Sequence, residues 1–154
     1  MVKLLRKGRV EPQMEPASNP LKPQINTDER GFEASNRLTH QIIGSAMKVS
    51  NTLGAGFLEM PYENALAHEL RKTGLGVKQQ EPVTIFYDGI VVGDYVLDLL
   101  VEDKVVPELK ACKAIDPAHV AQTINYLRAT RYRIGLILNF GTPRLQHKCL
   151  FNQL

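Results

Sequence analysis

Apolar residues spaced three and four apart predict two helices in the first half of the chain. From Asn36 onward the apolar positions recur at this spacing until the Gly54-Ala55-Gly56 break. A second helical pattern covers residues 58–72, and Gly74 is a typical stop signal directly after it. We therefore expect two consecutive helices joined by a short glycine-rich turn.

Three strands are predicted next, because the apolar pattern changes to short runs separated by turn residues. The runs cover residues 82–87, 90–101 and 105–110. Asp88-Gly89 between the first two runs is a strong signal for a two-residue hairpin turn. The charged triplet Glu102-Asp103-Lys104 separates the second run from the third. This pattern predicts a meander of three strands.

The last predicted elements are one helix and one strand. Asp116 followed by Pro117 is a typical helix start, with aspartate at the N-cap and proline at the first helical position. From Arg133 the sequence RIGLILNFG reads as a strand buried on both faces. The order helix, helix, three strands, helix, strand predicts an α/β domain in which the last helix makes a crossover connection.

Residues 1–30 differ from the rest of the chain. They contain four of the nine prolines and show no sustained periodicity. We expect a disordered or loosely attached leader there, followed by one domain over residues 31–154. At 154 residues and 44% apolar content, the chain is long enough to bury a core.

Composition narrows the class of protein. The apolar runs are far shorter than the ~20 residues that a membrane span requires, and the basic N-terminus lacks the apolar core of an export signal. Cys112 and Cys149 have no metal-ligand spacing. We expect a cytoplasmic protein with reduced thiols and no membrane partner.

The net charge of +3 is uninformative, but its distribution is uneven. Residues 128–148 hold five basic residues and no acid, namely Arg128, Arg131, Arg133, Arg144 and Lys148. Such a segment is compatible with a phosphate-bearing ligand, and we take Arg128 and Arg131 as candidate substrate contacts. A solvated surface accounts for the same charges equally well.

Three charged residues, Asp98, Glu108 and Lys110, lie inside predicted strands. Glu108 and Lys110 are two residues apart and so point to the same face. A three-residue turn would pair Val101 with Val105, which places Asp98 opposite Glu108. Two carboxylates and one ammonium group would then share one site.

Two facing carboxylates repel each other, and burial adds to the cost of their charges. A divalent cation removes both problems, and hard oxygen ligands favour Mg²⁺ or Mn²⁺. A neighbouring lysine can hold or deprotonate a water molecule, so the set suits metal-dependent hydrolysis of a phosphodiester. The alternative is a buried salt bridge between Lys110 and one of the acids.

The spacing of Asp98, Glu108 and Lys110 resembles the D-x(6–20)-(D/E)-x-K pattern of the PD-(D/E)XK nuclease superfamily. The element order from the second helix onward is similar to the restriction-endonuclease-like α-β-β-β-α-β core with a mixed sheet, here preceded by an extra N-terminal helix. Gln122 and Tyr126 resemble the Q-x-x-x-Y motif of one nuclease branch, which implies contact with the site or with nucleic acid. The alternative for Tyr126 is a half-buried core aromatic.

The sequence GFLEMPYENAL also resembles the GxxExxY family, through Gly56, Glu59 and Tyr62. This resemblance implies a carboxylate supplied by the second helix, either Glu59 or Glu63, one helical turn apart. We prefer Glu59 as a third metal ligand because the family pattern names it, while Glu63 is also consistent with a solvated helix charge. Ser50 departs from the family, which commonly has histidine there.

From these features we expect a Mg²⁺- or Mn²⁺-dependent nuclease acting on DNA or RNA, as a homodimer or a subunit of a complex. Asp98, Glu108 and Lys110 would carry the chemistry, with Glu59 or Glu63 assisting. His119, one turn before Gln122, is a further candidate for lining the site. The rival hypothesis is a non-catalytic module that binds nucleic acid or protein and retains the nuclease fold.

Overall fold

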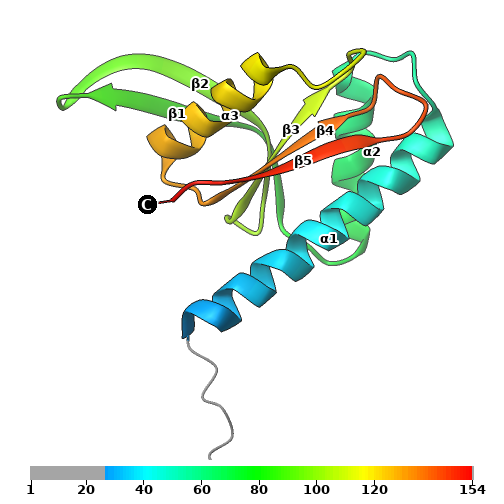
Figure 1. Ribbon diagram of the computed structural model, residues 1–154, viewed down its shortest axis with the longest axis horizontal. Coiled ribbons are helices and arrows are strands. Elements are labelled where there is room, and N and C mark those ends of the chain that lie inside the picture. The colour runs from blue at the N-terminus through cyan, green and yellow to red at the C-terminus, as the bar shows by residue number, and fades with distance from the viewer. Residues whose placement is uncertain (1–26, 154) are drawn as a thin grey trace, which may run out of the picture.

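The computed structural model describes residues 27–153, with side chains from Arg30 onward, and contains three helices and five strands in that range (Figure 1). The predicted leader therefore lies mostly outside the described residues. The elements, in chain order, are α1 (Thr27–Leu53), α2 (Glu59–Lys72), β1 (Val77–Tyr87), β2 (Ile90–Val101), β3 (Val105–Lys110), α3 (Pro117–Thr130), β4 (Ile134–Asn139) and β5 (Gln146–Phe151).

The strands form one mixed sheet in the order β1-β2-β3-β4-β5. Neighbouring strands are antiparallel except β3 and β4, which are parallel with Val105 opposite Ile134 and Lys110 opposite Asn139. The parallel pair requires a crossover, and α3 supplies it. The predicted α/β class, mixed sheet and extra N-terminal helix are confirmed.

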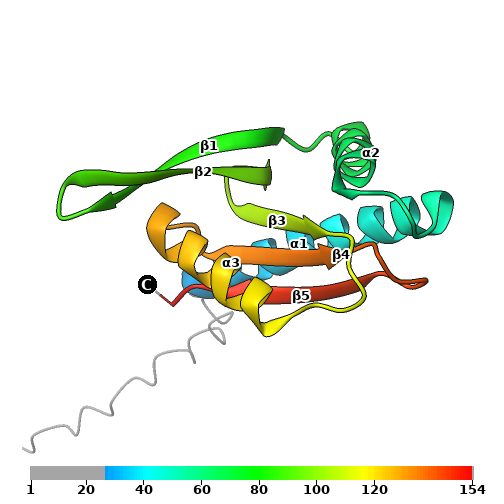
Figure 2. The same cartoon turned by 90° about the horizontal axis from the view of Figure 1, so that it is seen from above.

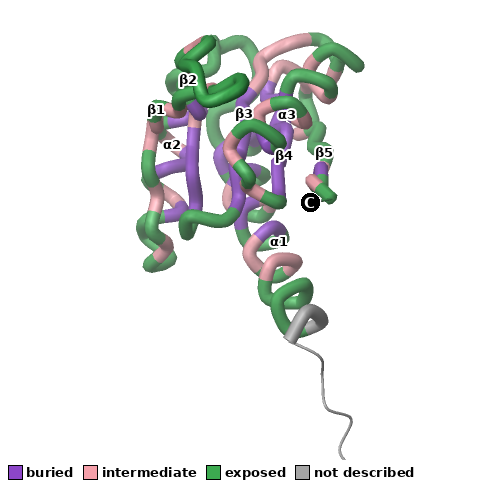
Figure 3. Tube along the Cα trace, turned by 90° about the vertical axis from the view of Figure 1, so that its left-hand side faces the viewer, coloured by how far each residue is buried: buried purple, intermediate pink, exposed green. Residues whose placement is uncertain are grey.

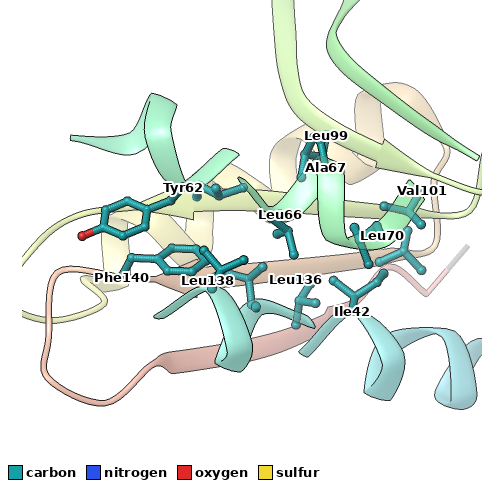
Figure 4. Close-up of a cluster of buried hydrophobic side chains, with 14 of the residues drawn as sticks. Ile42, Tyr62, Leu66, Ala67, Leu70, Leu99, Val101, Leu136, Leu138 and Phe140 are labelled. Atoms are coloured by element: carbon teal, nitrogen blue, oxygen red, sulfur yellow. The ribbon is translucent and has the colours of Figure 1, made fainter. Parts of the chain in front are cut away.

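Helices cover both faces of the sheet (Figure 2). One apolar cluster joins α1 and α2 to β2, β3 and β4, and a second joins α3 to the opposite side of the same strands. Buried residues concentrate in the central strands β3 and β4 (Figure 3). The first cluster is the larger, and in it Tyr62, Leu66 and Leu70 of α2 are gathered with Leu136, Leu138 and Phe140 of the β4 segment (Figure 4).

Strand β4 is buried on both faces, as its uninterrupted apolar sequence predicted. Ile134, Leu136 and Leu138 pack into the cluster beneath α1 and α2, whereas Ile137 packs beneath α3. Gly135 also faces α3. A Cβ atom there would lie 2.9 Å from Thr123 Cγ2 and 3.0 Å from Leu127 Cδ1, so the absence of a side chain lets α3 approach β4 closely.

Three boundaries differ from the sequence prediction. Helix α1 begins at Thr27 rather than Asn36, because residues 30–34 are solvent-exposed and the sequence before Asn36 lacks an apolar face that would mark a helix. Strand β1 begins at Val77 rather than at residue 82. The first half of this strand is mostly polar, so it lacks the apolar run by which the strands were predicted. Strand β5 was not predicted, since only its Leu150 is buried. No helix in the described range combines the length and apolarity that a membrane span requires.

The contact between Gly135 and α3 gives a stability prediction. Gly135→Ala should destabilise the protein by about 1–3 kcal/mol, because the added methyl group overpacks the interface with Thr123 and Leu127. The matched control is Gly44→Ala in α1, where an added Cβ meets no atom within 4 Å. That change should stabilise the helix by about 0.5–1 kcal/mol. Chemical denaturation measures both, and equal effects of the two changes would contradict this packing.

Candidate active site

The site lies where β2 and β3 separate. In the described part of the chain their ladder has one residue pair, Val101 with Val105, as the predicted turn required. Asp98 was expected directly opposite Glu108, but the two residues do not pair in a ladder. Instead, Asp98 Oδ2 accepts a hydrogen bond of 2.9 Å from the backbone N–H of Leu109. The carboxylate of Asp98 therefore bridges the gap between the diverging strands.

Strand β2 changes its packing side at Asp98. Leu97 packs beneath α3, whereas Leu99 packs in the cluster beneath α1 and α2. The neighbouring strand β1 is irregular at the same level, because Gln80 has a positive φ of 51° and is not paired with Asp98. Since alternate residues of a regular strand share a face, this irregularity turns the hairpin and releases Asp98 from regular strand pairing.

Glu108 is the most strongly perturbed acid in the site. It is 3% exposed, and its Oε2 accepts a hydrogen bond of 3.2 Å from the Tyr95 hydroxyl. Its Oε1 is buried without any hydrogen-bond partner. Burial, and next the Asp98 carboxylate, raise the pKa of Glu108 to about 8, although Lys110, Tyr95 and the backbone N–H of Asp98 act in the opposite direction. At neutral pH this carboxyl group is therefore mostly protonated.

The environment of Asp98 also disfavours the charged form of its carboxyl group. Burial is the main cause that raises its pKa, and the Glu59 carboxylate adds to the effect. The Leu109 N–H and the Lys110 ammonium group oppose it. The site therefore holds two acids whose negative charges are unfavourable in the absence of a counter-charge.

Lys110 does not form the buried salt bridge that was the alternative interpretation. The ion pairs found within the described residues join Glu69 to Lys48 and Lys72, and Lys78 to Asp103. Lys110 is half-buried, and its charge lowers the pKa of both Asp98 and Glu108. Its ammonium group is thus close enough to act on both acids without being paired to either.

The end of β3, where Lys110 lies, is fixed by Asn139 of β4. This fully buried side chain accepts hydrogen bonds from the N–H groups of Cys112 and Gly141 and donates to the Cys112 carbonyl. The Phe140 N–H donates to the Lys110 carbonyl at 2.8 Å. A Cβ atom on Gly141 would collide with the backbone of Cys112. The sequence NFG thus clamps the chain directly after Lys110.

Tyr126 contributes through Tyr95. The two rings stack with centroids 3.5 Å apart, and Tyr95 donates to Glu108. Tyr126 therefore contacts Tyr95, which in turn holds Glu108. Gln122 is exposed one helical turn away. The stack holds the Tyr95 hydroxyl against Oε2 of Glu108, so Oε1 is the oxygen of this carboxyl group that has no hydrogen-bond partner among the described residues.

The structure distinguishes the two candidate carboxylates of α2. Glu63 is 2% exposed and accepts hydrogen bonds from Gln79 at 3.2 Å and from Gln80 at 2.8 Å. Burial is the main cause that raises its pKa, and the nearby Asp98 adds to it. Glu59 is exposed but raises the pKa of Asp98. Glu59 therefore acts on Asp98 and Asp98 acts on Glu63, and Glu63 is not the solvated helix charge that was one interpretation.

Tyr62, the tyrosine of the G-x-x-E-x-x-Y sequence, is a structural residue. Its buried ring stacks on Phe140 with centroids 4.6 Å apart. Its hydroxyl donates to the Gly54 carbonyl and accepts from the Phe57 N–H. Gly56 in the same turn has a φ of 118°, which L-residues rarely adopt. These contacts fix the turn from which α2 begins and thereby the position of Glu59.

The structure does not support two expectations from the sequence, those for His119 and for the basic residues between 128 and 148, because of where these residues lie. His119 Nδ1 accepts the Asp116 N–H at 3.1 Å, so this histidine completes the capping box of α3. The five basic residues do not form one patch. Arg128, Arg131 and Arg133 flank the start of β4, roughly 16 Å along the strands from the level of Lys110, whereas Arg144 and Lys148 lie beyond the far end of β4 and on β5.

The residues present fit a hard divalent cation with few protein ligands. The unpartnered Oε1 of Glu108 and the Asp98 carboxylate are oxygen donors of the kind that Mg²⁺ and Mn²⁺ prefer. Within the described residues no group of three or more His, Cys, Asp or Glu side chains is arranged to hold a metal. Mg²⁺ is commonly held by one or two carboxylates together with water and substrate phosphate, and Asp98 and Glu108 are two such groups.

Comparison with known proteins identifies the family. The model of the PD-(D/E)XK nuclease superfamily matches residues 36–150. The chain therefore belongs to this superfamily, and its Asp98, Glu108 and Lys110 occur at the spacing that gives the superfamily its name. No curated protein matches the chain.

Two solved structures resemble the fold. A structure described as "Crystal structure of SSO0001" superposes with a TM-score of 0.50 at 17% identity, covering 62% of this chain and 51% of that one. The chain thus spans about half of that protein. An alkaline exonuclease (LHK-Exo) from Laribacter hongkongensis gives a TM-score of 0.44 at 15% identity, covering 83% and 71% of the two chains. At 17% identity the likeness to the first of these structures concerns the fold alone.

Sequence reasoning missed the supporting residues of the site. Tyr95, Gln79, Gln80 and Asn139 each donate a hydrogen bond to a site carboxylate or to a segment next to it. Only Asn139 carried a signal, as an uncharged polar residue at the end of a continuous apolar strand. The others are ordinary strand residues, and their roles depend on the change of packing side in β2 at Asp98.

The raised pKa of Glu108 predicts how stability depends on pH. An acid whose pKa is higher in the folded state than its ordinary value of 4.5 binds more protons when folded, so stability falls as pH rises from about 4.5 to about 8. The fall should reach a few kcal/mol at most, since one pKa unit corresponds to about 1.4 kcal/mol. Asp98 and Glu63 add effects of the same sign.

Glu108→Gln removes this charge and keeps the shape. Without metal, the variant should match the wild type near pH 5 and exceed its stability by about 1 kcal/mol or more near pH 8.5. Chemical denaturation in EDTA at several pH values measures the difference, with the exposed Glu33→Gln of α1 as control. A large loss of stability at pH 8.5 would indicate a buried ion pair with Lys110 and contradict the assignment.

Proposed function

We propose that this chain is a nuclease that hydrolyses phosphodiester bonds of DNA or RNA with Mg²⁺ or Mn²⁺. The observation that carries this proposal is the buried, unpartnered Oε1 of Glu108 beside Asp98. A protein rarely leaves a buried carboxylate oxygen without a partner, because the desolvation cost is not recovered. A cation held between Glu108 and Asp98 would recover it. Membership of the superfamily supports the same conclusion.

Each residue has a role that follows from its position. Asp98 and Glu108 would hold the cation, which when bound supplies Lewis-acid polarisation of the scissile phosphate. Lys110 carries a positive charge that acts on both acids, so its ammonium group can orient the attacking water and stabilise the negative charge that develops on it. Tyr95 keeps Glu108 in one orientation, because its hydroxyl occupies Oε2.

The carboxylates of α2 would assist in different ways. Glu63 is buried and held by Gln79 and Gln80, so it would fix the β1–α2 contact behind Asp98. Glu59 is exposed and close enough to Asp98 to raise its pKa, so it would bind the cation through a water molecule. The fixed turn of the G-x-x-E-x-x-Y sequence supports placing the chain in the GxxExxY family within the superfamily.

On the substrate side we propose Gln122 and Tyr126 rather than the arginines for contacts at the reacting phosphate. Gln122 is exposed on the same helical face as Tyr126, which stacks on Tyr95. Arg128 and Arg131 lie toward the other end of the strands, so they could reach only flanking nucleotides.

The rival function is a binding module that has kept the fold without catalysis. The separation of the basic residues favours the protein-binding form of this rival, because backbone binding to nucleic acid relies on many neighbouring Lys and Arg contacts. The presence of Asp98, Glu108 and Lys110 together in one site favours the nuclease.

A cleavage assay separates the two functions. Purified protein is incubated with end-labelled single- and double-stranded DNA and RNA, with Mg²⁺, with Mn²⁺ or with EDTA. We expect metal-dependent cleavage that Glu108→Gln and Lys110→Ala each reduce by at least about 100-fold, because each removes a group acting on the reacting atoms. Glu33→Gln is the control, since Glu33 is exposed on α1.

The same assay assigns the α2 acids. Glu63→Gln should lower the melting temperature as well as the rate, because its hydrogen bonds to Gln79 and Gln80 are weakened. Glu59→Gln should lower the rate by about tenfold or less without changing stability. The absence of cleavage in either metal would contradict the nuclease and favour the rival function.

A further inference from the structure

The outer part of the β1–β2 hairpin projects from the molecule as a two-stranded ribbon (Figures 1 and 2). We call residues 81–96 the arm. Strand β1 is the edge of the sheet, and the β2–β3 ladder is confined to Val101 and Val105, so within the described residues no third strand pairs with the arm. A two-stranded hairpin alone is marginally stable in water. The arm therefore requires additional contacts or tolerates unusual exposure.

The tip of the arm exposes large apolar side chains on both faces. Tyr87 is 74% exposed, Ile90 65% and Phe86 64%. Val91 and Val92 are adjacent on one strand, so they point to opposite faces, and both are exposed. The six exposed apolar residues of the arm are Phe86, Tyr87, Ile90, Val91, Val92 and Val96. They amount to roughly 500 Å² of apolar surface, at the upper end of what soluble monomers expose.

The charge of the arm restricts its partner. It contains Glu81, Asp88 and Asp94 and no Lys, Arg or His. Such a ribbon would be repelled by nucleic-acid phosphates and by anionic lipid. An apolar surface with acidic groups instead fits a protein surface that offers apolar side chains and basic residues.

The chain itself offers such a surface at the base of the arm. Tyr126 of α3 stacks on Tyr95, and Tyr132 packs in the same cluster as Val83. These contacts place the C-terminal end of α3 beside the arm base, as Figures 1 and 2 both show. That end carries Arg128, Arg131 and Arg133, all exposed. The acidic turn at Asp88 is at the opposite end of the arm.

We propose that the arm docks on the arm of a second copy of this chain. Two arms packed antiparallel about a twofold axis would bring the Asp88 turn of each copy to the basic end of α3 of the other. One surface is then complementary to itself, as a twofold interface requires. Such a contact buries one face of each arm, so it covers roughly 500 Å² of apolar surface in total and is a small interface, to which the charges of Asp88 and the arginines add. The arrangement also gives a function to arginines that lie away from the carboxylates.

Sedimentation equilibrium of the full chain tests the interface. The wild type should be dimeric at micromolar concentration, and Tyr87→Ser with Ile90→Ser should weaken association by at least about tenfold. Leu58→Ser is the matched control, because Leu58 is 78% exposed on a different surface and should leave association unchanged. Thermal unfolding of each variant shows that the fold is retained. A wild type that remains monomeric to about 100 µM would overturn the proposal.

A charge exchange tests the antiparallel arrangement. Asp88→Arg should weaken the dimer because it places an arginine against the basic end of the other copy. Adding Arg131→Asp in the same chain should restore association. Aspartate suits this position because Arg131 has a positive φ of 62°, which aspartate tolerates. A dimer that Asp88→Arg leaves unchanged, or weakening that Arg131→Asp does not reverse, would overturn the arrangement. Association is measured without metal or nucleic acid, so this result is independent of nuclease activity.

Discussion

The site depends on the separation of β2 from β3. In the described structure the ladder between these strands is confined to the pair Val101 and Val105, and beyond that pair the strands diverge. A regular ladder would have satisfied the backbone groups of both strands and left no room between them. Because the strands diverge, the side chain of Asp98 takes over one backbone bond, to Leu109. Glu108 lies in the same gap, shielded from water but not fully paired. The geometry of the strands thus produces the unfavourable carboxylates.

The surrounding residues maintain this arrangement without neutralising it. Tyr95 satisfies one oxygen of Glu108, and the amides of Gln79 and Gln80 hold Glu63. Lys110 attracts both acids but, within the described structure, forms no ion pair with either. Each support is uncharged or at a distance, so the carboxyl groups of Asp98 and Glu108 remain available for a cation. Stability is lower than a fully paired core would give, as is common at functional sites.

Local signals in the sequence predicted most of the framework. The Asp88-Gly89 turn, the Asp116-Pro117 helix start and the register of Val101 with Val105 all appear in the structure. Features that depend on tertiary packing were not predictable. The kink at Asp98 arises from Gln80 on the neighbouring strand, and the choice between Glu59 and Glu63 depends on which of them α2 turns toward β1. Strand β5 is half exposed and has no clear alternation to reveal it.

The arm and the carboxylate site are linked through one contact. Tyr95 belongs to the arm base, stacks on α3 and donates to Glu108. Because of this link, a partner that orders the arm would also order the tyrosine that orients Glu108. Glu81 marks the inner end of the arm, next to the irregular Gln80 at which the hairpin turns.

The central claim is that Glu108 is held as a neutral acid until a cation binds between it and Asp98. Calorimetric titration with Mn²⁺ in buffers of different ionisation enthalpy counts the protons released on binding. With the pKa of Glu108 at about 8, about one proton should be released at pH 7 and almost none at pH 9. Binding at pH 7 without proton release, or no binding at millimolar Mn²⁺, would contradict the account.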